Sequence, residues 1–108
     1  MLEYLKNLLG LGKRKEELIE ALGKRPYIID VRTPQEYKMG HIQKAVNIPL
    51  DQIRDNAEKI RKMDKPVVTC CQTGSRSGRA RRILLKKGVP DVHNGRGWVS
   101  LKQLMKEI

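Results

Sequence analysis

The chain has 108 residues, about the length of one domain, which leaves no room for a second domain. Apolar residues make up 39% and charged residues 32% of the chain, a balance that excludes an intrinsically disordered protein. The net charge of +11 favours anionic partners, but it does not distinguish small oxyanions from nucleic acid or acidic proteins.

The first 14 residues predict a lead-in segment ahead of the domain at 15–108. Four leucines would share one side of a short amphipathic helix: Leu2, Leu5, Leu8 and Leu9. Such a helix could pack on its own domain, which we favour, or touch a membrane surface. No stretch approaches the roughly 20 apolar residues of a membrane span, and no signal-peptide cleavage site follows. We therefore expect a cytoplasmic protein.

The first elements of the domain have clear boundary signals. Residues 15–22 predict a helix with Glu16 and Glu17 in its first turn, and residues 27–31 predict a buried strand. Thr33 and Glu36 then form a capping box around Pro34, which predicts a short helix ending at Gly40.

Further strands and helices follow in alternation. Strands are predicted over 45–48, 66–70 and 89–93, and helices over 51–63, from 76 to 88, and from 101 onward behind a capping box of Ser100 and Gln103. This order predicts an α/β fold with a central, mostly parallel sheet and helices on both faces. Ligands of such sheets bind beyond the carboxyl ends of the strands, so the turn after the third strand is the first candidate site.

That turn, residues 71–77, has the composition of an anion-binding loop. Successive backbone N–H groups in a tight turn can point inward, and the N-terminus of the following helix adds positive potential. Gly74 permits a backbone angle or a close approach that other residues resist. Such a setting would ionise Cys71 as a nucleophile, and Arg76 could bind an oxyanion. On the loop alone, a structural buried cysteine remains an alternative.

A series of short motifs along the chain resembles the rhodanese signature. The motifs are IDVR at 29–32, EY at 36–37, GHI at 40–42, AVNIP at 45–49, the loop CQTGSRS at 71–77, and VHNGRGW at 92–98. The resemblance covers residues 15–108 and implies the rhodanese-like α/β fold with a single-domain sulfurtransferase activity. It departs from the family at Cys70, usually an aromatic residue, and at Arg96, where a glycine is common.

The resemblance also implies roles for individual residues. Cys71 would take sulfane sulfur from a small anionic donor such as thiosulfate and pass it, as a persulfide, to cyanide or a thiol, including a thiol-bearing protein. No metal and no cofactor would be needed. Arg76 would hold the loop and attract the donor, Asp30 and Arg32 would form a supporting charge network, and His41 would be a turn residue. The persulfide would be cradled by Gln72, Thr73, Gly74, Ser75 and Ser77.

Two other classes of function stay open. The spacing from Cys70 to Arg76 matches that of cysteine phosphatases and arsenate reductases, but Gly74 lies three residues after Cys71, so we assign Cys71 as the nucleophile. A non-catalytic rhodanese-like binding module is the other alternative. Basic residues on the helix after the loop lack interleaved aromatics, so we expect no nucleic-acid partner.

Overall fold

The computed structural model describes residues 11–108, with side chains from residue 13 onward. Most of the predicted lead-in segment lies outside the described residues. The first described helix, α2 (Leu11–Leu22), begins earlier than predicted and has no acidic residue in its first turn, so the placement of Glu16 and Glu17 there was wrong. Among the described helices, none is both long and apolar enough to cross a membrane.

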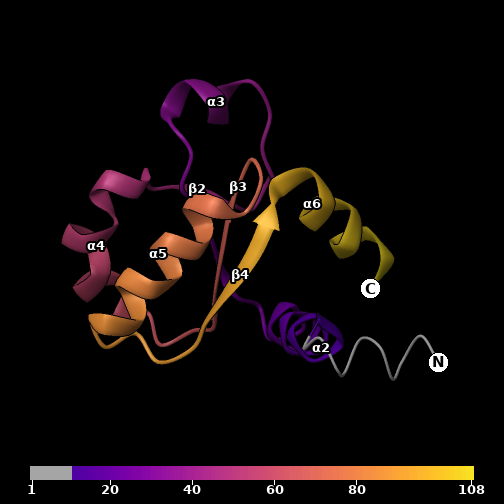
Figure 1. The fold of residues 1–108 in the computed structure, drawn as a ribbon, viewed down its shortest axis with the longest axis horizontal. Helices are drawn as coiled ribbons and strands as arrows, with labels where there is room; N and C mark the ends of the chain where they lie inside the picture. Colours follow the sequence, from indigo (N-terminus) through magenta and orange to yellow (C-terminus); the bar gives the residue numbers. More distant parts are fainter. Residues whose placement is uncertain (1–10) are drawn as a thin grey trace.

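Four parallel strands form one central sheet, as predicted (Figure 1). They are β1 (Tyr27–Asp30), β2 (Val46–Asn47), β3 (Val67–Cys71) and β4 (Val92–Gly97), in the spatial order β2-β1-β3-β4. β1 and β3 lie in the middle of the sheet, and their residues are almost all buried. Their carboxyl ends, at Asp30 and Cys71, therefore meet at one edge of the molecule.

Helices cover both faces of the sheet. In Figure 1, α4 (Leu50–Lys62) and α5 (Ser75–Lys86) lie on one side, and α2 and α6 (Trp98–Glu107) lie on the other. The short helix α3 (Pro34–Lys38) projects beyond the carboxyl ends of the strands. Its predicted start is confirmed, because the Thr33 hydroxyl accepts the Glu36 N–H while the Glu36 carboxylate accepts the Thr33 N–H.

Alternation along β3 divides its side chains between two apolar cores. Cys71 packs with Ile53 and Leu84 on the α4 and α5 face, whereas Cys70 packs with Leu18 and Leu101 on the α2 and α6 face. Successive residues of a strand point to opposite faces, so the two adjacent cysteines belong to different layers of the protein.

Two boundaries near the C-terminus differ from the prediction. β4 pairs with β3 from Val92 to Gly97, later than the predicted 89–93. Gly95 permits this pairing, because a Cβ at that position would lie 2.8 Å from the Thr69 carbonyl oxygen. α6 begins at Trp98, so Ser100 lies inside the helix and the predicted capping box with Gln103 was wrong.

Candidate active site

The turn between β3 and α5 is shorter than predicted and is shaped by a glycine. Cys71 is the last residue of β3 and Ser75 the first of α5, so only residues 72–74 lie between them. Gly74 has a φ of 103°, in the left-handed region, and a Cβ there would lie 3.2 Å from the Arg96 Cβ. The turn therefore needs glycine for its backbone angle and for its close approach to β4.

The sulfur of Cys71 is surrounded by hydrogen-bond donors. The Gly74 N–H donates to Sγ at 3.0 Å and the Ser77 N–H at 3.4 Å, and the Ser77 hydroxyl lies 3.4 Å away. Burial raises the pKa of the Cys71 thiol, but these contacts and the Thr73 amide lower it by more, so the net pKa lies below its ordinary value. The turn favours the anionic form of this one sulfur.

Ser77 links the sulfur to β4 through Asn94. Its hydroxyl donates to Asn94 Oδ1 at 2.6 Å, and that oxygen also accepts the Arg96 N–H at 2.8 Å. A hydroxyl has one proton, so it cannot donate to Asn94 and to Cys71 at once. We therefore expect a Cys71 thiol to donate to the Ser77 oxygen, and a Cys71 thiolate to accept the Ser77 hydroxyl proton in place of Asn94, which would still accept the Arg96 N–H.

Cys70 has the opposite environment. It is as fully buried as Cys71, but here burial prevails and, with a smaller contribution from the neighbouring carboxylate of Asp30, raises the pKa of the thiol to about 12. Both cysteines are free thiols. Of the two, only Cys71 has a setting that supports a nucleophile.

Arg76 is held by a carboxylate from the other side of the turn. Its guanidinium donates to both Glu36 oxygens, at 2.7 and 2.9 Å, and both side chains are about one third exposed. This pairing, together with the Thr33 N–H and hydroxyl, lowers the pKa of Glu36 to about 2. Glu36 therefore caps α3, as predicted, and also fixes Arg76, a contact that the sequence analysis missed.

Asp30 and Arg32 form a buried ion pair beneath α3. Arg32 Nη2 lies 2.7 Å from Asp30 Oδ2 and also donates to the Gly40 carbonyl at 2.7 Å. The guanidinium lies 4.8 Å from the centre of the Trp98 ring, and its pKa is raised chiefly by the bond to Asp30. The pair ties β1 to the segment that carries Glu36.

The other residues singled out from the sequence lie around this centre. Ser77 is buried against Cys71, whereas the side chains of Gln72, Thr73 and Ser75 are exposed. His41 lies in the irregular segment after α3, with Nδ1 2.7 Å from the Tyr37 carbonyl oxygen, and the turn itself is at residues 43–44. Within residues 13–108, no three histidines, cysteines or acids lie close enough to hold a metal ion.

Asn94 and Glu36 are the members of the site that sequence reasoning did not assign to it. Asn94 donates to the Gly74 carbonyl at 3.1 Å and accepts from Ser77, so it holds both ends of the turn. Asn94 stands in the VHNGRGW motif, directly after the predicted last strand. Neighbouring parallel strands end at the same edge of the sheet, so this position could have assigned Asn94 to the site.

The site therefore consists of a cysteine at the end of a strand in a parallel sheet, with its sulfur held by the amides of the following turn. This arrangement defines an α/β domain with a strand-end cysteine site. The profile of the rhodanese-like domain matches residues 14–100, and the chain belongs to that family. This confirms the resemblance of the motifs.

Relatives and a solved structure agree with this assignment. The chain is 44% identical over 82 residues to the uncharacterized protein YqhL of Bacillus subtilis (strain 168), covering 76% of this chain and 64% of YqhL. It is 37% identical over 70 residues to the thiosulfate sulfurtransferase PspE of Escherichia coli (strain K12), covering 64% of this chain and 67% of PspE. A solved structure of a rhodanese with anions from E. coli superposes with a TM-score of 0.63 at 35% identity, covering 68% of this chain and 88% of that one.

Proposed function

We propose that the protein is a sulfurtransferase that carries sulfane sulfur on Cys71. The Cys71 thiolate attacks the outer sulfur of thiosulfate, a new S–S bond forms, and sulfite leaves with the electron pair of the broken S–S bond. Cyanide or a thiolate then attacks the outer sulfur of the persulfide, which regenerates the Cys71 thiolate. The observation that carries this proposal is the set of donors directed at Sγ from Gly74 and Ser77.

The turn supports both halves of this reaction without a base. Donors that hold the Cys71 thiolate remain aimed at the sulfur when it becomes the leaving group in the second step. A persulfide places its outer sulfur about 2.05 Å beyond Sγ of Cys71, and the acceptor attacks that outer sulfur. Because this chemistry needs a free thiol, we place the protein in a reducing compartment such as the cytoplasm.

The alternatives have weaker support. A cysteine phosphatase that uses Cys70 would need a thiolate at a buried sulfur whose pKa is raised to about 12. A phosphatase that uses Cys71 would need Arg76 to bind phosphate, but Glu36 occupies that guanidinium. A non-catalytic module would have no use for a thiol whose pKa is lowered by its own turn.

Mass spectrometry after incubation with thiosulfate tests the proposal. We expect a gain of one sulfur atom mapped to Cys71 and reversed by cyanide. Cys71→Ser should show no gain, while Cys70→Ser, which changes a sulfur on the other face of the sheet, should still acquire it. Circular dichroism checks that both variants fold. Sulfur on Cys70, or none on a folded wild-type protein, would contradict the assignment.

A further inference from the structure

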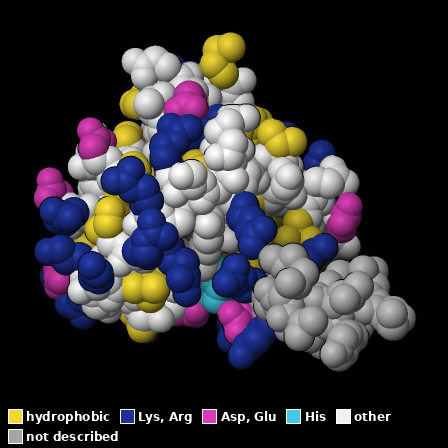
Figure 2. Space-filling model, in the orientation of Figure 1, with side chains coloured by type: hydrophobic (Ala, Val, Ile, Leu, Met, Phe, Trp, Pro, Cys, Tyr) yellow, Lys and Arg dark blue, Asp and Glu magenta, His cyan; other side chains and the backbone are white. Residues whose placement is uncertain are grey.

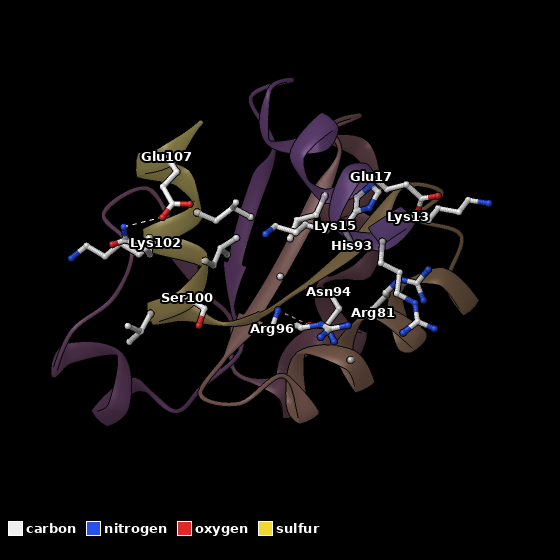
Figure 3. A pocket seen from close by; sticks show the side chains of 18 of the residues that line it. Lys13, Lys15, Glu17, Arg81, His93, Asn94, Arg96, Ser100, Lys102 and Glu107 are labelled. Atoms are coloured by element: carbon white, nitrogen blue, oxygen red, sulfur yellow. Dashed lines mark hydrogen bonds between the residues drawn. The ribbon is translucent and has the colours of Figure 1, made fainter. Parts of the chain in front are cut away.

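A large basic groove lies beside the catalytic turn. It has a volume of about 1350 Å³ and is lined by α2, α5, β4 and α6. Figure 3 shows Lys102 on α6 at the left, Lys15 on α2 near the centre, and Asn94 and Arg96 of β4 below Lys15. The basic side chains of its lining include Lys13, Lys15, Arg81, Arg82, Arg96 and Lys102.

The groove and the reactive sulfur share a wall. Asn94 and Arg96 line the groove, and Asn94 also bonds to Ser77 and Gly74, which contact Sγ of Cys71. Arg96 packs directly on Gly74. A molecule that occupies the groove therefore lies one layer of side chains from the turn.

The size of the groove points to a macromolecule. Small-molecule sites enclose about 300–1,000 Å³, and thiosulfate has only five atoms, so the proposed donor needs no groove of this volume. A segment of a partner chain fits the space better, and the density of Lys and Arg requires that this segment be acidic.

The lining favours protein over nucleic acid. Among the described residues, the lining contains no Phe, Tyr or Trp on which bases could stack, and the ring of His93 is held by Asp91 at 2.6 Å. It offers apolar contacts instead, from the exposed Val99 and the half-buried Leu104. Glu17 and Glu107 interrupt the positive surface and would repel the uninterrupted charge of a phosphate backbone, whereas an acidic protein segment can place apolar residues opposite them.

We propose that this groove docks an acidic segment, with apolar residues interspersed, of the protein whose thiol accepts sulfur from Cys71. The proposal rests on the proposed sulfurtransferase function for the chemistry, but not for the binding. Figure 2 shows Lys and Arg side chains spread over α5 as well, so approach of such a partner would also be steered by the charge of this face.

Fluorescence anisotropy with a defined probe tests the docking. The probe is a fluorescein-labelled 16-residue peptide of Glu with Leu at helical spacing, and a labelled oligouridine serves as the nucleic-acid comparison. The groove variant is Lys15→Glu with Lys102→Glu, from opposite walls. The matched control is Lys59→Glu with Lys62→Glu, two exposed residues of α4 on the other face of the sheet.

We expect the groove variant to bind the peptide at least about tenfold more weakly than the wild type, and the control to stay within about twofold, because both carry the same net charge. Equal weakening of peptide binding in both variants would refute docking in the groove. The proposal would also be refuted if the wild type bound oligouridine more tightly than the peptide and only the groove variant lost that binding. Thiosulfate:cyanide transfer should be unchanged in both variants. If the wild type had no thiosulfate:cyanide transfer activity, the proposed function would be refuted, but the result on peptide binding would still hold.

Discussion

Replacing Ser77 with alanine tests how the turn stabilises the Cys71 anion. The Ser77 hydroxyl lies 3.4 Å from Sγ and 2.6 Å from Asn94 Oδ1, and its single proton serves one of them at a time. In the thiol form it donates to Asn94, and in the thiolate form it turns to the sulfur. Ser77→Ala removes this response but leaves the Gly74 and Ser77 amides in place.

The size of the effect follows from the exchange of partners. A hydrogen bond to a charged group contributes about 1.5–3 kcal/mol, while the neutral bond given up at Asn94 contributes about 0.5–1.5 kcal/mol. The net stabilisation of the thiolate is then about 1 kcal/mol, with the long 3.4 Å contact at the weaker end. At a pH below the titration midpoint, the variant should hold roughly fivefold less thiolate, because about 1.4 kcal/mol is a factor of ten.

Alkylation with iodoacetamide measures the thiolate directly. The rate at Cys71, followed by mass spectrometry from pH 5 to pH 10, should fall about fivefold on the acid side and reach the wild-type plateau on the alkaline side. Cys70 does not interfere, because burial raises its thiol pKa to about 12. Ser75→Ala is the matched control, since Ser75 is exposed at the start of α5. A folded Ser77→Ala protein whose profile superposes on the wild type would show that only the amides stabilise the anion.

Three further changes have defined outcomes. The Glu36 pKa of about 2 lies below its ordinary value of 4.5, so its pairing stabilises the fold above pH 4.5 and is lost as the pH falls toward 2. In urea unfolding, the free energy of unfolding of Glu36→Gln should therefore fall less between pH 4.5 and pH 2 than that of the wild type. Parallel curves of unfolding free energy against pH for the two proteins would argue against the pairing. Gly95→Ala places a Cβ 2.8 Å from the Thr69 oxygen and should lower the free energy of unfolding by about 1–3 kcal/mol, a result that an unchanged urea midpoint would exclude. Arg96 has a φ of 65°, in the left-handed region. Relief of about 1–2 kcal/mol of strain, less about 0.5–1 kcal/mol of glycine entropy, should make Arg96→Gly up to about 1.5 kcal/mol more stable, and a lower melting temperature would count against this reasoning.

The alternating pattern of the chain was sufficient to predict the parallel sheet and its two layers of helices. Local signals also located the capping box of Thr33 and Glu36, and the need for glycine at position 74. These features depend on residues close together in sequence, whose preferred backbone angles and hydrogen bonds act over a single turn.

The last strand was misplaced because its composition is unlike that of a strand. Val89 looks like a strand residue, and it is buried in the core, but it lies before β4. The strand itself has the sequence VHNGRG, which has low strand propensity. Its two glycines are required because the neighbouring backbone of β3 and its turn comes too close for a Cβ. Tertiary packing decided this element, and that information is absent from local preferences.

The bond between Glu36 and Arg76 escaped prediction for a related reason. The two residues are 40 positions apart, and each has a complete local explanation, as a helix cap and as a loop cation. Only the adjacency of β1 and β3 brings their segments together. The same holds for Asn94, whose contacts cross from β4 to the start of α5.

The double role of Glu36 has a consequence for local unfolding. α3 has five residues and none is buried, so its stability depends on its cap and on the contacts around it. Because one carboxylate serves both the cap and Arg76, opening of α3 also releases Arg76. Amide hydrogens of α3 should exchange together and faster than those of the core strands. The frequency of that opening then sets a lower limit on how often the Arg76 side of the turn is free to move.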